Sequence, residues 1–434
     1  MQISKRKLIN TLFLLGFPCY GIGFYLGVKQ AFTAGMVFSA LPFILILAIH
    51  GIDLIYRGQA RVMVNRIYWI ALAFLISMAA GMWVAMLRGF PGYNLINTTG
   101  QTIMILIPFN AAVVVRIVNL DDPRFDMAGL MLKSLSLLIG INFLGYASGM
   151  SNLVHSFPGR ISLPFMRGIY DAAHLLSIIN LMLLFHLRDP LRKPITFAVL
   201  GTFFLVNTAV MVDVNSRLSF LVFLVLTVLF ITRVMRRARY VYAISLFTLP
   251  LLLSFALLIY QVLTLPIFEA ILSRVSKEDV TTFNGRSYIW YAAWDWLVND
   301  RRGLLFGGGY NAQHALGFMK RIARLWGVER PALIHMHSSS LQILMAQGVT
   351  GFALMCTCLW YAYDRFRKFF RADTKEAPLF AAVVYLLFIW QVDIFCYGLD
   401  FGIPILFCML AYIAVDTAPS RQGGVVAGPA VGGA

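Results

Sequence analysis

Apolar stretches follow one another along almost the whole chain, separated by short polar segments. Most stretches are about 20 residues long, the length that a helix needs to cross the hydrocarbon core of a bilayer. The pattern predicts an all-α integral membrane protein with about 12 transmembrane helices. The predicted spans cover approximately residues 8–28, 31–50, 67–87, 96–115, 127–147, 171–187, 195–211, 218–232, 240–262, 340–363, 378–396 and 400–416.

The composition agrees with a membrane protein. Hydrophobic residues make up 60% of the chain and charged residues 13%, which is too little charge to cover the surface of water-soluble domains of this length. The five cysteines all lie inside apolar stretches, so we interpret them as small core residues. The sequence therefore predicts neither a disulfide framework nor a zinc site.

The net charge of +17 is concentrated in short segments between the apolar stretches. This is the distribution that the positive-inside rule describes for cytoplasmic loops. An N-terminus in the cytoplasm places every basic cluster, and the C-terminus, on that side. No basic stripe interleaved with aromatic residues appears elsewhere, so we expect membrane lipids and no nucleic acid as partners. The clusters cover residues 5–7, 57–66, 116–124, 188–193, 233–239 and 365–375.

This topology divides the chain into four parts. Residues 1–262 hold transmembrane helices one to nine, 263–339 form a large outer loop, 340–416 hold the last three helices, and 417–434 form a tail that we expect to be disordered in the cytoplasm. The loop is the only extended polar region, and loops of this length usually carry function. In its aromatic segment Trp290 and Trp294 are one turn apart, which predicts a helix in the membrane interface.

His337 is the best candidate for a general base. It lies where the outer loop meets a predicted helix, and histidine is the side chain whose unperturbed pKa lets it accept a proton near neutrality. The first alternative is that His335 and His337 belong to a polar helix cap, with Ser338 or Ser339 as the N-cap residue. A metal site ranks third, because Glu329 is the only acidic residue nearby in the sequence.

Arg217 lies in a very short outer turn between two apolar stretches. An arginine at membrane depth costs a few kcal/mol, so it normally faces a polar cavity or a partner. The alternatives are that it reaches the lipid headgroups or pairs with Asp213. With Arg160, Arg167 and Arg286 it predicts a cationic pocket on the outer face, because guanidinium groups bind phosphate oxygens bidentately. Arg160 and Arg167 are equally well explained as ordinary loop charges.

Two other features of the outer face have ambiguous roles. The glycine run 307–309 lacks the Lys-Ser/Thr pair of a P-loop, which favours a tight turn over a phosphate cradle. Asp393 and Asp400 bracket a short outer turn near the end of the chain. Contact with the outer cavity and pairing with an arginine explain these two residues equally well.

Several short motifs follow one another in the large outer loop and the next span. They are Asn284-Gly285-Arg286, Trp290, Gly307 with Gly309, His337, and Gly348 with Gly351. In the order and spacing of these motifs the chain resembles the superfamily of O-antigen ligases and O-antigen polymerases. The shared region covers about residues 263–351 and the turn at Ser216-Arg217, and the membrane topology is similar across nearly the whole chain.

Among the members, the O-antigen ligases fit best. The resemblance implies a GT-C-like glycosyltransferase of the bacterial inner membrane, with interfacial helices in a periplasmic loop that forms the active site. It implies inverting transfer of O-antigen polysaccharide from undecaprenyl pyrophosphate to the terminal sugar of lipid A–core, with neither metal nor cofactor. His337 then takes the role of the essential histidine, and the donor pyrophosphate binds Arg217, Arg286, Arg160 and Arg167. The supporting residues would be His335, Asn284 and Ser338.

Elementary chemistry agrees with this assignment. A pyrophosphate leaves readily once its charge is neutralised, and the acceptor hydroxyl must lose a proton as it attacks. An O-antigen polymerase or a protein O-oligosaccharyltransferase would use the same donor with a different acceptor, and both remain alternatives. A transporter or lipid flippase would show repeated halves and polar sites at the midplane, whereas the polar residues here gather at one face.

Overall fold

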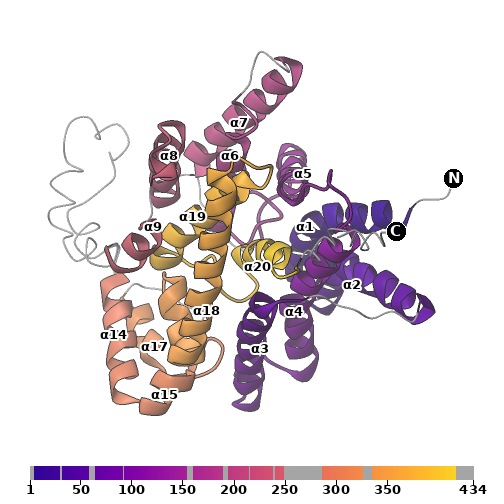
Figure 1. Ribbon diagram of the computed structural model, residues 1–434. Coiled ribbons are helices and arrows are strands. Elements are labelled where there is room, and N and C mark those ends of the chain that lie inside the picture. The colour runs from indigo at the N-terminus through magenta and orange to yellow at the C-terminus, as the bar shows by residue number, and fades with distance from the viewer. Residues whose placement is uncertain are drawn as a thin grey trace, which may run out of the picture.

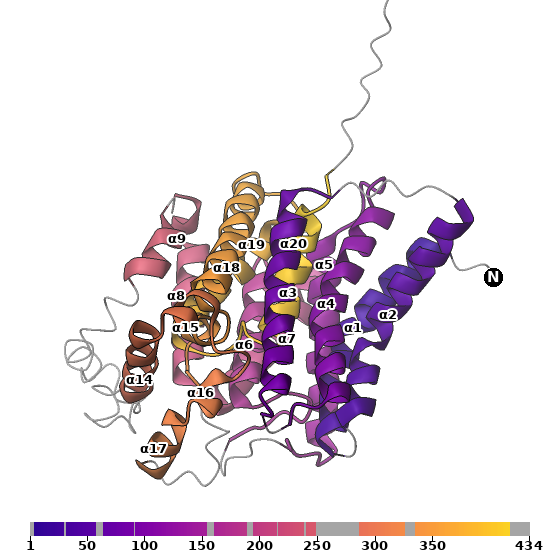
Figure 2. The same cartoon turned by 90° about the horizontal axis from the view of Figure 1, so that it is seen from below.

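The chain folds into a bundle of long helices with a group of short helices at its edge (Figures 1 and 2). Within the described residues, the one β pairing is an isolated bridge between Val64 and Val415. The all-α membrane class is therefore confirmed. The computed structural model describes residues 4–29, 32–57, 64–90, 92–153, 160–188, 194–214, 216–237, 240–248, 286–325 and 335–416.

Seven of the described helices are long and apolar enough to cross a membrane. Four shorter apolar helices lie where the sequence predicts further spans. The count of about 12 spans stays a prediction, because most of the span predicted at 240–262 lies outside the described residues. The long helices are α1 (Lys5–Lys29), α2 (Phe32–Arg57), α3 (Arg66–Leu87), α4 (Leu95–Val118), α5 (Met127–Ala147), α7 (Pro194–Val214) and α18 (Ser339–Arg371). The shorter ones are α6 (Ile169–Leu183), α8 (Arg217–Ile231), α19 (Ala377–Val392) and α20 (Gly402–Ile413).

The buried helices α19 and α20 form the middle of the bundle (Figure 1). Almost every side chain of α19 is buried, including Tyr385 and Trp390, as expected of a helix that is apolar on all sides. Helices α6, α8 and α18 pack around α19, while α3 and α4 pack against α20. Three minor turns, η1 (Val234–Arg236), α9 (Val241–Ala243) and η2 (Ile244–Thr248), follow α8. The bundle thus brings α6, α8, α18 and α19 together around one core.

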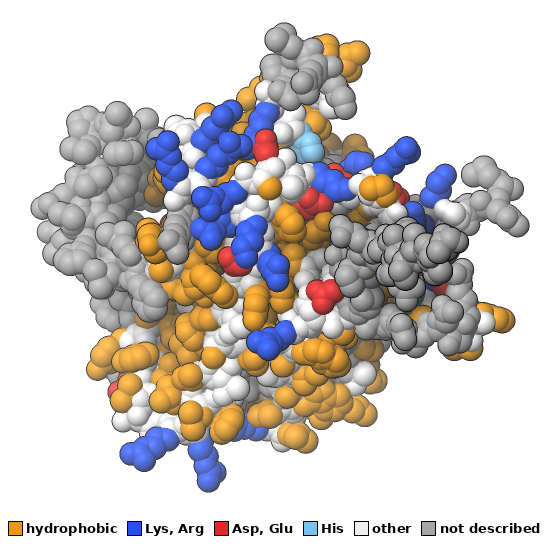
Figure 3. Space-filling view, in the orientation of Figure 1, with side chains coloured by type: hydrophobic (Ala, Val, Ile, Leu, Met, Phe, Trp, Pro, Cys, Tyr) orange, Lys and Arg blue, Asp and Glu red, His pale blue; other side chains and the backbone are white. Residues whose placement is uncertain are grey.

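Polar contacts gather several of the basic segments at one end of this bundle. Arg6 at the start of α1 pairs with Asp122 before α5, at 3.2 Å. Arg188 after α6 and Arg236 after α8 both pair with Asp373, which follows α18, at 2.9 and 3.7 Å. Figure 3 shows Lys and Arg side chains clustered over these helices. The structure therefore places together segments that the charge pattern assigns to the cytoplasm.

The short helices of the large loop pack around a small core of their own. They are α14 (Arg286–Asn299), α15 (Arg301–Phe306), α16 (Ala312–Ala315) and α17 (Phe318–Leu325). Ile289 and Leu297 on α14 are buried with Met319 on α17, while Tyr291 and Trp294 on α14 are exposed. The predicted aromatic helix is present, and its exposed aromatic side chains suit the interface that we predict for it.

Helix α18 is broken at Gly348, where φ is +66°. Carbonyl groups next to the break accept hydrogen bonds from the glycine turn. Met345 O accepts from Gly308 N at 2.8 Å, and Ala346 O accepts from Gly309 N at 3.1 Å. These amide groups are therefore engaged by the protein, which favours a tight turn over a phosphate cradle. The predicted span 340–363 consists of two helical pieces joined at this break.

We predict that Gly348→Ala destabilises the protein strongly. A Cβ at this position would lie 2.4 Å from Leu305 C, and the φ angle is one that side chains rarely adopt. Backbone strain of this kind costs about 1–3 kcal/mol before the collision is counted. The melting temperature in detergent should fall by several degrees. Gly140→Ala is the matched control, since nothing lies within 4 Å of the added carbon. Equal melting temperatures for the two variants would contradict a rigid break at Gly348.

Candidate active site

Several contacts fix the loop of residues 335–337 before α18 begins. Trp290 Nε1 on α14 donates to Met336 O at 2.8 Å, and Met336 N donates to Gln342 Oε1 on α18 at 3.3 Å. The Met336 side chain is fully buried in the small core between α14 and α17. Because the middle residue of the loop is held in this way, the two flanking histidines have defined positions.

His337 adopts the left-handed backbone conformation, with φ of +50°. Non-glycine residues seldom adopt it, and such strain persists where the surrounding structure enforces it, often at functional sites. Its amide donates to His335 Nδ1 at 3.3 Å, and the two ring centroids are 4.1 Å apart. Burial lowers the pKa of His314 on α16. The strained backbone and the held loop are features of residues 335–337.

The first two serines after His337 make different contacts. Ser338 is the N-cap of α18, and its hydroxyl accepts from Leu341 N at 3.3 Å. The backbone amide and hydroxyl of Ser339 donate to Asp393 O at 3.0 and 2.9 Å. The Ser339 hydroxyl also accepts from the amides of Phe395 and Cys396 at 3.0 and 3.1 Å. The cap interpretation therefore holds for Ser338, while Ser339 joins the histidine loop to the turn after α19.

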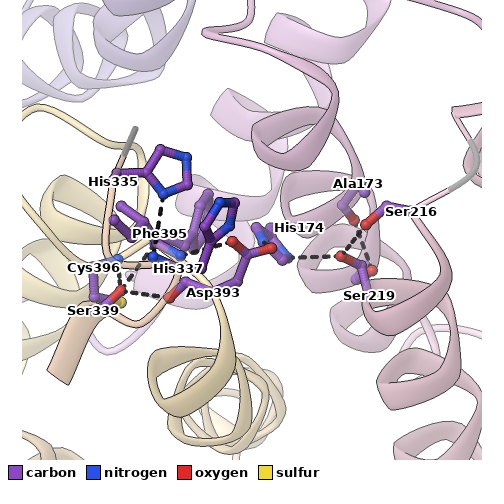
Figure 4. Close-up of polar contacts among 12 residues, drawn as sticks. Ala173, His174, Ser216, Ser219, His335, His337, Ser339, Asp393, Phe395 and Cys396 are labelled. Atoms are coloured by element: carbon purple, nitrogen blue, oxygen red, sulfur yellow. Dashed lines mark hydrogen bonds and ion pairs between the residues drawn. The ribbon is translucent and has the colours of Figure 1, made fainter. Parts of the chain in front are cut away.

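Asp393 begins that turn and is only 2% exposed. Its Oδ1 accepts from Ile394 N at 2.9 Å, and its Oδ2 lies 3.4 Å from Nε2 of His174 on α6. His337, Asp393 and His174 follow one another across Figure 4. A carboxylate removed from water needs such polar partners. The predicted contact of Asp393 with the outer cavity stays a prediction, and an observed ion-pair partner of this carboxylate is a histidine.

His174 continues the contacts toward the start of α8 (Figure 4). It is fully buried, and its Nδ1 lies 2.9 Å from Tyr385 Oη and 3.1 Å from Ser219 Oγ. Ser219 Oγ is in turn 2.7 Å from Ser216 Oγ, and Ser216 directly precedes Arg217. We call Ser339, Asp393, His174, Ser219 and Ser216 the polar row. It joins the loop of the candidate base to the turn of a candidate phosphate ligand.

Arg217 and Arg286 are the first residues of α8 and α14. The side chains of both arginines lie outside the described part of the structure, as does the whole of Asn284, so their predicted roles stay predictions. Their backbone positions are informative. The start of a helix carries partial positive charge on its amide groups, which adds to an arginine in attracting phosphate.

Arg167 is engaged by a carboxylate. Its guanidinium lies 2.5 Å from Asp400 Oδ1 and over the Phe24 ring, 5.3 Å from the centroid. Pairing with an arginine, the second explanation offered for Asp400, is therefore observed. Arg160 lies half-buried in the same loop. Phosphate binding by Arg160 and Arg167 remains a prediction, and the ion pair gives Arg167 a structural role.

Sequence reasoning did not identify His174. The available signal was an ionisable residue inside an apolar span, which is by default a reason to suspect function. Asp171 lies three residues earlier on the same helix and is also buried. A metal interpretation of His335 and His337 gains no support, since no cluster of three or more possible ligands occurs within the described residues.

The comparisons with known proteins agree with the resemblance drawn from the motifs. The family model described as O-Antigen ligase matches residues 201–356. This segment contains α8, α14 to α17, the loop of His337 and the break at Gly348, while His174 and Asp393 lie outside it. A comparison with curated proteins found no match. Within residues 201–356 the chain is thus similar to the O-antigen ligase family, whose members are glycosyltransferase-like enzymes of the ligase and polymerase type.

Proposed function

We propose that this protein is an O-antigen ligase of the bacterial inner membrane. It moves O-antigen polysaccharide from undecaprenyl pyrophosphate to the terminal sugar of lipid A–core on the periplasmic face. The observation that carries the proposal is the polar row, which ends beside the His337 loop on one side and at Arg217 on the other. A candidate base and a candidate phosphate ligand, far apart in the sequence, thus share one network.

In the reaction, His337 accepts the proton of the acceptor hydroxyl as that oxygen attacks the anomeric carbon of the donor. A new glycosidic bond forms while the bond from the anomeric carbon to the diphosphate oxygen breaks. The electron pair of that bond leaves with undecaprenyl pyrophosphate, and the proton stays on the imidazole. A single displacement inverts the anomeric configuration. The buried Asp393 beside the loop favours the imidazolium that forms, because opposite charges attract strongly where water is excluded.

The departing diphosphate carries the negative charge that develops in this step. Arg217 and Arg286, together with the amide groups at the starts of α8 and α14, neutralise it in place of a divalent metal. The contacts of two acids on the predicted outer side agree with this assignment. Asp400 pairs with Arg167, and Asp393 pairs with His174. Both carboxylates are therefore already engaged by the protein.

An O-antigen polymerase would use the same donor and the same displacement, with a growing glycan as acceptor. Deletion of the gene separates the two functions. Loss of a ligase leaves long undecaprenyl-linked polymer and bare lipid A–core, whereas loss of a polymerase leaves single repeats. A transporter is disfavoured by the placement of the loop helices α14 and α17, which lie toward one side of the bundle (Figure 2).

We predict that α17 faces the periplasm and the end of α18 faces the cytoplasm. Lys320 on α17 and Lys368 on α18 are both exposed, which makes Lys320→Cys and Lys368→Cys a matched pair in a cysteine-free background. An impermeant maleimide should label the first in whole cells and the second only after permeabilisation. The opposite pattern would overturn the periplasmic site.

We predict that His337→Asn lowers the transfer rate by about 10²–10⁴, the usual contribution of a general base. Asparagine tolerates the left-handed backbone, so the variant should fold and isolate the loss of the imidazole. His335→Asn is the matched control and should be much milder. Transfer from the undecaprenyl-linked glycan to lipid A–core is measured with purified protein in detergent. A His337→Asn protein as active as the wild type would refute the assigned base.

We predict full activity in EDTA, with Arg217→Ala and Arg286→Ala each severely impaired. A charge-assisted contact is worth about 1.5–3 kcal/mol, which corresponds to a rate loss of about 10- to 150-fold for each arginine. Lysine should restore little activity at either position, because its ammonium group lacks the planar guanidinium that binds phosphate bidentately. Arg302→Ala, at an exposed position on α15, is the control. Activity that disappears with EDTA and returns with Mg²⁺ would contradict the role of the arginines and indicate a carboxylate–metal site.

A further inference from the structure

We propose that His174 is a positioning residue for glycan transfer, which orients the Asp393 carboxylate and sets the His337 loop against the start of α8. The inference rests on the proposed function and deepens it. His174 lies inside an apolar helix, outside the large loop and outside the segment that matches the family model.

His174 presents its two ring nitrogens to different partners. Nδ1 lies within hydrogen-bond distance of the hydroxyls of Tyr385 and Ser219, at 2.9 and 3.1 Å. Nε2 faces the Asp393 carboxylate at 3.4 Å, an ion-pair contact without hydrogen-bond geometry. The imidazole therefore lies between the first turn of α8 and the Asp393 carboxylate.

Several elements of the bundle meet at this imidazole. His174 lies on α6, Ser219 is in the first turn of α8, Tyr385 lies on α19 and Asp393 follows α19. Ser339 holds the other side of the Asp393 turn and is two residues from His337. Among the described side chains, His174 makes polar contacts with both the first turn of α8 and the Asp393 turn (Figure 4). It therefore controls how these two parts lie relative to each other.

Packing alone does not explain a histidine here. His174 is completely buried, with 0% accessible surface, and an apolar side chain of similar size would avoid the cost of burying two ring nitrogens. The ring also lies 4.8 Å from the Phe395 ring, centroid to centroid. Its polar contacts run toward the site at one end and toward Arg217 at the other.

The test uses two amide replacements that divide the contacts of the imidazole. Glutamine places its amide near Nε2 and can still donate to Asp393. Asparagine is shorter, places its amide near Nδ1, and keeps only the Tyr385 and Ser219 side of the network. The full-length protein is assayed with undecaprenyl-linked glycan and lipid A–core, and kcat and the donor KM are determined together with the melting temperature. His50→Asn on α2 is the control for removing a histidine.

We expect His174→Asn to lower kcat by about 10- to 100-fold, the usual effect of losing the partner that orients a functional group, with the donor KM within about twofold. His174→Gln should recover most of kcat, and His50→Asn should match the wild type. Equal kcat for the asparagine and glutamine variants, or a loss that appears in KM, would overturn the positioning role. If His337→Asn is inactive while His174→Asn is normal, this inference alone fails. If His337→Asn is active, the proposed function fails first.

Discussion

A carboxylate inside an apolar bundle is stable only when the protein supplies its partners, and Asp393 is the residue on which the rest of this site depends. One of its oxygens accepts a backbone amide and the other faces His174. Leaving a buried charge without its partner costs about 3–5 kcal/mol, so this requirement fixes the position of α6 relative to the turn after α19. Ser339 transfers that constraint to the loop of His337.

The contact between the glycine turn and α18 is a second constraint on the position of the His337 loop. The backbone of Gly308 and Gly309 lies against α18 at its break, where an added Cβ at Gly307 would lie 2.2 Å from Ala346 C. Trp290 then reaches Met336 from α14. The loop helices are thus joined to the bundle both before and after the candidate base. A mobile loop would leave the histidine without a defined position, whereas this arrangement positions it before substrate binds.

Much of the fold could be predicted from the sequence, because apolar length and the placement of Lys and Arg are local properties of the chain. The same is true of His337 and Arg217, since each stands at the border between polar and apolar segments. The break at Gly348 could not be predicted in this way, because it depends on carbonyl groups that pair with a turn about 40 residues earlier. The link from Asp393 through His174 to Ser219 was also out of reach, because only tertiary packing brings these three residues, from separate parts of the chain, together.

The distribution of charge in the structure explains why a net charge of +17 indicates so little about the substrate. Several of the cations lie at the end where Asp122 and Asp373 pair with them, which is the end that the positive-inside rule assigns to the cytoplasm. At the other end Arg167 pairs with Asp400, which gives this arginine a structural role. The arginines that begin α8 and α14 each stand at a helix start, so in the proposed function the recognition of a diphosphate depends on their position rather than on the total charge.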